Sequence, residues 1–183
     1  MNMLMWILVS FYFFLPGGIA NMAPVLTRKL TFLDWMKKPI DGGRMWRGKP
    51  LLGANKTWKG VVMGAVFGMI VGIIQFFLQN SVGWMQLFPY TLGEAMLIGF
   101  LLGLGALVGD FVESFFKRRT SRKPGAPWFP FDQLDLVIGG MVFVSIYLVP
   151  PWQVWVSLLV CMPIVHFLFN VLGFGLGLQK EWW

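Results

Sequence analysis

The sequence is poor in cysteine, in histidine and in acidic residues. Its 183 residues include one cysteine, Cys161, one histidine, His166, and 8 acidic residues against 15 basic ones. A single cysteine excludes an intramolecular disulfide, and we expect it to pack inside its helix. We expect a structural role for His166 too, because it lies midway through an apolar run whose charged neighbours are elsewhere.

Charge of either sign is also scarce. Charged residues make up 13% of the chain, whereas hydrophobic residues make up 57%, and the mean hydropathy is +0.68. A soluble domain of this size cannot hide so much apolar surface from water. Five apolar runs are long enough, or nearly so, to cross ~30 Å of hydrocarbon. We therefore predict an all-α, polytopic integral membrane protein, a single membrane domain with five transmembrane helices at residues 3–23, 60–79, 92–108, 131–149 and 152–172.

The basic residues predict the topology. The first apolar run lacks the basic leader of a secretory signal peptide, and nine Lys or Arg residues follow it between Arg28 and Lys59. The positive-inside rule then places the N-terminus outside and puts loops 24–59 and 109–130 and the C-terminus in the cytoplasm. All 15 basic residues and every acidic residue except Glu94 fall on that side. We therefore expect a cell-membrane protein whose active site faces the cytoplasm.

One pair of acidic residues closes the third apolar run. Asp110 and Glu113 are one helical turn apart, so both side chains project from the same face of the helix. They lie toward a helix C-terminus, where the macrodipole disfavours negative charge. A divalent cation would offset that cost, and oxygen ligands without histidine or thiol indicate Mg²⁺ or Mn²⁺. The alternative is a salt-bridged surface pair.

A second pair, Asp132 and Asp135, has the same spacing at the start of the fourth run. These aspartates could cap the helix. However, a span that began after them would have about 15 residues, too few to cross comfortably. They therefore lie at the membrane boundary, where ionisable groups are often functional. Both pairs can converge on one metal cluster suited to phosphoryl or nucleotidyl transfer, with basic residues around it: Lys117, Arg118, Arg119, Arg122 and Lys123.

The stretch GKPLLGANKT, residues 48–57, nearly matches a nucleotide-binding P-loop. Ala54 and Asn55 separate Gly53 from Lys56, which breaks the spacing of that motif, and no strand precedes it. The second span begins here, and either Asn55 or Thr57 can cap it. Lys56 and Lys59 flank its first amides, so we expect an anion site at this helix N-terminus.

Two further patterns concern the helices themselves. Leu26, Leu30, Leu33 and Met36 share one face of residues 26–36, which predicts an amphipathic helix on the cytoplasmic leaflet, either a passive connector or a collector of anionic lipid. Glycines at small-residue spacing predict close helix packing: Gly60, Gly64, Gly68 and Gly72 in the second span, and Gly99 with Gly103 and Gly105 with Gly109 in the third.

Two motifs support a resemblance to a known family. SFFKRRTSRK is similar to the S-x-x-K-R-x-x-x-x-K part of the phosphatidate cytidylyltransferase pattern, through Ser114, Lys117, Arg118 and Lys123. With RGKPLLGANKTWKG, the closer resemblance is to the CDP-archaeol synthases, the archaeal ether-lipid family of that superfamily. It extends from about residue 41 to residue 140. The chain departs from the superfamily pattern at Pro124 and Gln133, where that pattern has Asp and Arg.

The resemblance implies Mg²⁺-dependent transfer of CMP from CTP to a membrane lipid phosphate, an unsaturated archaetidic acid, with release of pyrophosphate. No nucleic acid partner is expected. Asp110, Asp132 and Asp135, with Glu113, would hold the metal. Lys56 and Lys59, with Asn55 and Thr57 at the start of the second span, would bind the β and γ phosphates. The remaining basic candidates would bind the lipid phosphate or the leaving group: Arg47, Lys49, Lys117, Arg118 and Lys123.

Two other functions stay open at this point. The DGGR stretch at Asp41 resembles the opening of the CDP-alcohol phosphotransferase motif, but no acidic residue lies between Asp41 and Glu94 to complete it. A small non-catalytic transport or scaffold subunit would leave the basic residues unexplained. The backbone of residues 51–55 is a candidate for reading the cytosine base.

Overall fold

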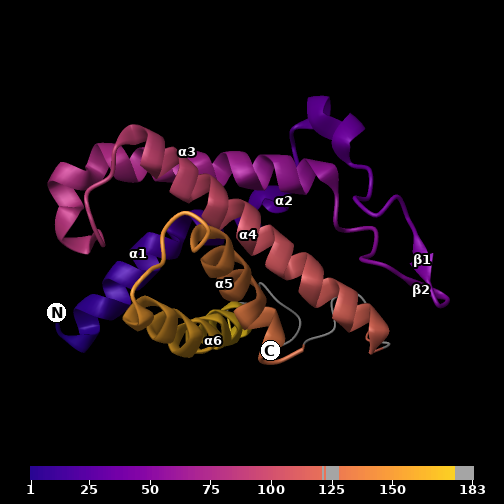
Figure 1. Ribbon diagram of the computed structural model, residues 1–183. Helices are drawn as coiled ribbons and strands as arrows, with labels where there is room; N and C mark the ends of the chain where they lie inside the picture. The colour runs from indigo at the N-terminus through magenta and orange to yellow at the C-terminus, as the bar shows by residue number, and fades with distance from the viewer. Residues whose placement is uncertain (121, 123–127, 176–183) are drawn as a thin grey trace.

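A bundle of helices with one short hairpin at its edge forms the structure, a computed structural model that describes residues 1–120, 122 and 128–175 (Figure 1). The α-helices are α1 (Met3–Asn21), α2 (Ala23–Leu26), α3 (Trp58–Val82), α4 (Leu92–Arg119), α5 (Phe131–Val144) and α6 (Trp152–Gly175). The shorter elements are the 3-10 helices η1 (Thr31–Met36) and η2 (Gly83–Met85) and the strands β1 (Met45–Trp46) and β2 (Lys49–Pro50).

The structure confirms the mostly helical fold, and its long apolar helices fit a membrane protein. Among the described residues, α1, α3 continued by η2, and α4 are long and apolar enough to cross a membrane, and residues 152–168 of α6 form a shorter apolar helix. The predicted boundaries of the fourth span are wrong, because α5 ends at Val144 and not at residue 149. The hydroxyl of Ser145 donates to the Met141 carbonyl at 2.7 Å, and a turn follows. With 14 residues, α5 is about 21 Å long. The count of five spans therefore stays a prediction.

Helix α4 is the centre of the bundle and packs against α1, α3 and α5. The largest fully buried side chains come from four different helices and include Phe14, Leu102, Met141 and Leu158. Lipid tails are as apolar as these side chains, so close packing rather than removal from water holds such helices together.

Glycines provide that close packing, as their spacing predicted. A side chain on Gly68 or Gly72 of α3 would collide with the backbone of α4. On the other face of α4, a Cβ on Gly105 would lie 2.5 Å from the Gly139 carbonyl oxygen, and one on Gly109 would collide with the Asp135 carbonyl. Helix α5 therefore touches α4 backbone to backbone beside Asp110.

The prediction of an amphipathic helix at residues 26–36 is wrong. Helix α2 ends at Leu26, where the Thr27 hydroxyl donates to the Ala23 carbonyl at 2.7 Å, and η1 begins only at Thr31. Beneath η1, the Nζ atom of Lys59 donates to the Leu30 carbonyl at 2.8 Å. These local hydrogen bonds replace a continuous helix with two short pieces.

The hairpin was not predicted. Strands β1 and β2 pair antiparallel, and the turn between them places Arg47 at φ 51° and Gly48 at φ 74°. Two consecutive residues of positive φ are typical of the tight turn that matches strand twist. At the right of Figure 1 the hairpin projects past the bundle, and its strand β2 contacts α4.

Candidate active site

A cavity of about 680 Å³ lies where the end of α1, the loop after the hairpin, the last turns of α4 and the start of α5 meet. It gathers charged side chains of both signs. The described residues that line it are Asn21, Lys49, Pro50, Leu52, Gly53, Ala54, Asn55, Lys56, Asp110, Glu113, Ser114, Lys117, Arg118, Arg122, Asp132, Asp135 and Leu136.

Helix α4 supplies Asp110, Glu113 and Lys117 from one face, as the helical spacing predicted. The macrodipole argument for this pair is wrong, however. The helix continues to Arg119, more than two turns beyond Asp110, and the effect is confined to the last turn. That last turn carries Lys117, Arg118 and Arg119, which suit the negative end of the dipole. The side chains of Glu113 and Lys117 are both buried.

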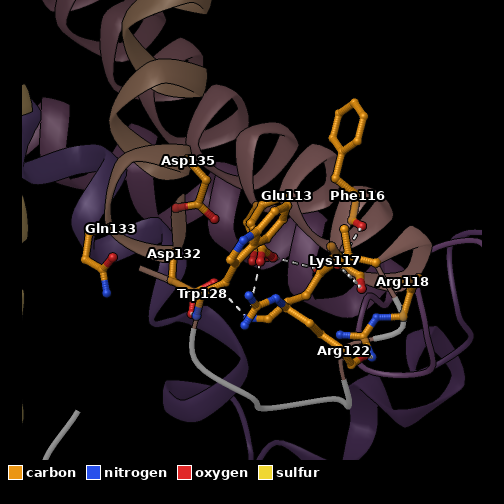
Figure 2. A network of polar contacts seen from close by, with 12 residues as sticks. Glu113, Phe116, Lys117, Arg118, Arg122, Trp128, Asp132, Gln133 and Asp135 are labelled. Atoms are coloured by element: carbon orange, nitrogen blue, oxygen red, sulfur yellow. Dashed lines mark hydrogen bonds and ion pairs between the residues drawn. The ribbon is translucent and has the colours of Figure 1, made fainter. Parts of the chain in front are cut away.

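Helix α5 supplies Asp132 and Asp135. Figure 2 shows both side chains projecting toward Glu113 and Lys117 of α4, whereas Phe116 points away. The carboxylate of Asp132 accepts from the Trp128 amide at 2.8 Å and from Nζ of Lys117 at 2.7 Å. Among the described residues no side chain caps α5, which follows Pro130. These aspartates therefore do not cap the helix.

Three carboxylates lie close enough to share a cation. One carboxylate oxygen from each of Asp110, Glu113 and Asp135 lies within 4.8 Å of the other two. Among the described residues, this is the group of acidic side chains that could hold a metal ion. The Oε1 atom of Glu113 is buried, with the Nζ atom of Lys117 at 3.2 Å. A set of oxygen ligands alone fits a hard divalent cation.

Two lysines reach into this cluster. The Nζ atom of Lys56 is 2.5 Å from Oδ2 of Asp110. The Nζ atom of Lys117 is 3.2 Å from Oε1 of Glu113 and bridges it to Asp132. Each ammonium group is thus placed beside the carboxylates and within the cavity, where an anionic ligand would meet both.

Asp41 shapes the cavity wall from behind. Its carboxylate accepts from the amides of Gly43 and Leu52, each at 2.9 Å, and of Gly53 at 3.4 Å. Burial alone would raise the pKa of Asp41, but these backbone donors outweigh it and lower the pKa below its ordinary value. Gly53 sits at φ 108°, a conformation that glycine adopts readily. Sequence reasoning considered Asp41 only within the DGGR stretch and missed this role.

Some predicted residues do not reach the cavity. Arg47 lies over the Trp46 ring at the hairpin turn, the Thr57 hydroxyl caps α3 by accepting from the Gly60 amide at 3.3 Å, and Lys59 is buried under η1. The wall is the loop of residues 49–56, with Lys49 and Asn55, rather than the first turn of α3. Lys123 lies outside the described residues. Asn21, from the end of α1, lines the cavity without any signal in the sequence.

His166 stands apart from the residues that line the cavity. Its Nδ1 atom is 3.3 Å from Nε2 of Gln133, which joins α6 to the start of α5. This contact agrees with the structural role expected of the only histidine.

A bundle of apolar helices with a charged cavity is the architecture of an intramembrane enzyme. The family model described as CarS-like, CDP-archaeol synthase, matches residues 3–183. The CDP-archaeol synthase of Thermococcus onnurineus is 36% identical over 185 residues, which cover 100% of this chain and 99% of that protein. The CDP-archaeol synthase of Methanosphaerula palustris is 38% identical over 154 residues, 79% of this chain and 89% of that protein.

A solved structure, described as an intramembrane enzyme for archaeal membrane lipids biosynthesis, matches with a TM-score of 0.68 and 28% identity. The match covers 88% of this chain and 92% of that one. The chain belongs to the CarS-like, CDP-archaeol synthase family. This membership confirms the resemblance seen in the motifs and the expectation of an enzyme, a cytidylyltransferase of archaeal lipid biosynthesis. It leaves the phosphotransferase and the non-catalytic alternatives without support.

Proposed function

We propose that the chain transfers CMP from CTP to an unsaturated archaetidic acid, releasing pyrophosphate and leaving CDP-archaeol in the membrane. The observation that carries this proposal is the cavity in which Lys56 and Lys117 meet the carboxylates of Asp110, Glu113 and Asp135. Such a site offers charges of both signs to two highly anionic substrates. The family membership supports the choice of reaction.

The proposed reaction does not require the protein to act as a strong base. An oxygen of the lipid phosphate attacks the α-phosphorus of CTP, and the bond from that phosphorus to the β-phosphate oxygen breaks. The attacking phosphate monoester is already ionised at pH 7, so no strong general base is required. That matches a cavity that lacks histidine among its described lining residues.

Asp110, Glu113 and Asp135 would hold Mg²⁺, with Asp132 as a fourth candidate. When bound, the metal would supply neutralisation of triphosphate charge and orientation for in-line attack. Lys56 would bind the β and γ phosphates. Lys49, Lys117 and Arg118 line the cavity and are candidates for the lipid phosphate or the leaving group, and Arg122 lines it as well. Asn55 lies beside Lys56 on the wall.

The membrane arrangement is part of the proposal. We infer that α1, α3, α4, α5 and α6 are five spans of one membrane domain, with the N-terminus outside and the cavity on the cytoplasmic side. The segregation of the basic residues supports this topology. The cavity lies near the C-terminal end of α4, and the only outside acidic residue expected, Glu94, lies in the first turn of that helix.

The test is a transfer assay with purified protein in detergent. CTP should be converted to CDP-lipid and pyrophosphate only when lipid phosphate and Mg²⁺ are both present, and chelation of the metal should stop the reaction. Release of CMP from a supplied CDP-lipid, with transfer of its phospholipid group to an added alcohol, would instead identify the phosphotransferase reaction. Absence of transfer under all these conditions would refute the proposal.

The matched variant for that assay is Asp110→Asn. An amide is a weaker ligand for a hard cation but has a similar shape. We expect Asp110→Asn to remove nearly all turnover while the protein still inserts and elutes as the wild type does. Wild-type turnover in this variant would contradict a metal at the three-carboxylate group.

A further inference from the structure

The cavity wall of residues 49–56 has little regular structure of its own. Strand β2 supplies Lys49 and Pro50, and it pairs with the two residues of β1. A ligand that had to order such a loop would lose affinity in proportion to the freedom removed. Contacts that fix the wall beforehand therefore influence binding without touching the ligand.

Arg119, the last residue of α4, makes contacts of this kind. Its Nη1 atom donates to the Trp46 carbonyl at 2.9 Å, and its Nη2 atom donates to the carbonyls of Lys49 and Pro50. In the other direction, Nζ of Lys49 donates to the Arg119 carbonyl at 2.9 Å. The end of α4 is thus bonded to both strands of the hairpin.

Two stacked aromatic rings lie beside the same guanidinium. Trp46 of β1 stacks on Phe115 of α4 with ring centroids 5.5 Å apart. The Arg119 guanidinium carbon lies 5.4 Å from the centroid of Trp46 and 5.0 Å from that of Phe115. A planar fork that donates to several carbonyls and lies against aromatic faces suits arginine and not lysine.

We propose that Arg119 is a positioning residue for the nucleotide. It fixes the wall of residues 49–56 against the end of α4, so that Lys49, Asn55 and Lys56 stand at a set distance from the carboxylates before CTP arrives. The residues that line the cavity include its neighbour Arg118 but not Arg119 within the described chain. This inference rests on the proposed function and adds to it a residue that acts through the wall.

The experiment compares Arg119→Gln and Arg119→Lys with the wild type. Hydrogen exchange of peptides from residues 44–56 is measured without ligand, CTP binding by calorimetry with Mg²⁺, and turnover as a function of CTP concentration. Both variants should exchange faster in these peptides. Both should also weaken CTP binding and raise KM roughly tenfold, the effect of one or two charge-assisted hydrogen bonds. The kcat at saturating CTP should change less than about threefold, because Arg119 does not touch the reacting atoms.

Two further variants make the outcome decisive. Lys29→Gln removes the same charge at an exposed position of the segment before η1 and should leave exchange, KM and kcat unchanged. Trp46→Leu removes one ring from the half-exposed face of the hairpin and should raise KM in the same direction as Arg119→Gln.

Several results would overturn the proposal. Wild-type affinity in Arg119→Lys would assign the effect to charge alone. Faster exchange with unchanged CTP affinity would show that the fixed wall does not serve the nucleotide. A collapse of kcat with unchanged KM would place Arg119 in the chemistry. The proposed function is judged separately, by whether the wild type binds and consumes CTP at all.

Discussion

At the scale of single residues, Lys56 and Lys117 are the lysines that form ion pairs with the carboxylates lining the cavity. Lys56 comes from the loop and pairs with Asp110 of α4, 54 positions further along the chain. Lys117 comes from α4 itself and bridges Glu113 to Asp132. The two ammonium groups offset part of the negative charge of the carboxylates, and a bound phosphate would compete with the carboxylates for them.

We predict that Lys56→Ala weakens CTP binding roughly tenfold to a hundredfold and lowers turnover at least as much. The substitution removes an ammonium group that would donate hydrogen bonds to phosphate oxygens in a partly buried site. Lys56→Arg should recover only part of the affinity, because a guanidinium presents its charge differently. Calorimetry with Mg²⁺ and the transfer assay measure both, and Lys29→Ala serves as the exposed control. Wild-type binding in Lys56→Ala would move the phosphate site to Lys117 and Arg118.

A second prediction concerns Asp41 and pH. Its folded-state pKa is lowered, so its carboxylate stabilises the fold above the ordinary Asp pKa, and this contribution is lost as pH falls through the folded-state pKa. Asp41→Asn should therefore lower the free energy of unfolding by about 1 to 2 kcal/mol at neutral pH. The difference from wild type should be constant from about pH 7 to pH 5 and shrink below about pH 4. Thermal unfolding across this range measures it, and a difference that grew on acidification would contradict the prediction.

The sequence revealed these carboxylates because charge is rare in apolar helices, and a three-residue spacing places two side chains on one face. It could not reveal which lysine would meet which carboxylate. Lys59 has the same charge as Lys56 and lies three positions away, yet it is buried under η1. The direction of each side chain depends on the path of the loop, and Asp41 and Arg119 set that path from outside the cavity.

At the scale of secondary structure elements, the contact between α4 and α5 decides whether the carboxylates meet. Asp110 and Glu113 come from α4, whereas Asp135 comes from α5. Gly109 lets the two backbones touch at the turn that carries Asp110, because a Cβ there would collide with the Asp135 carbonyl. The distance between the helices thus controls the distance between the carboxylates.

We predict that Gly109→Ala separates these carboxylates. The added methyl group forces α5 away from α4, which should destabilise the protein by about 1 to 3 kcal/mol and lower turnover by more than roughly tenfold. Gly93→Ala is the matched control in the same helix, because a Cβ at Gly93 meets nothing within 4 Å. Thermal unfolding and the transfer assay compare the two. Equal turnover in both variants would show that this close approach is not needed.

Sequence periodicity predicted the long helices and their glycine contacts but failed for the shorter elements. A two-residue strand carries almost no pattern, and the turn at Arg47 has an arginine where positive φ usually favours Asn or Gly. The spacing of apolar residues at 26–36 is typical of an amphipathic helix. The chain instead forms two short helices, where Thr27 and Lys59 donate hydrogen bonds to backbone carbonyls. Local competition of this kind is not visible in hydrophobic spacing.

At the scale of the whole molecule, the charged residues and the cavity share one end of α4. The cavity gathers residues 49–56 and the last turns of α4, and the predicted cytoplasmic loops contain nearly all the charge of the chain. The arrangement favours a cytoplasmic site, where CTP is available.

We predict that an introduced cysteine at Ser81 is labelled from outside by an impermeant thiol reagent in intact cells, and that one at Met45 is not. Both positions are exposed, at the end of α3 and in the hairpin, respectively. The background is Cys161→Ser, which removes the single native thiol. Labelling of Met45→Cys becomes the positive result once the cells are opened. The reverse pattern would place the cavity outside and contradict the proposed topology.

Helix α4 has 28 residues and is about 42 Å long, whereas the hydrocarbon core of a bilayer is about 30 Å thick. If the helix crosses upright, its excess length stands among the lipid headgroups or in water. In that arrangement Asp110, about 27 Å from the first residue of the helix, would lie close to the depth at which hydrocarbon gives way to headgroups. In the proposed reaction, a lipid phosphate at that depth would meet the carboxylates while its chains remained in the leaflet. The substrate would then be spared extraction from the membrane, which costs about 0.8 kcal/mol for each CH₂ group exposed.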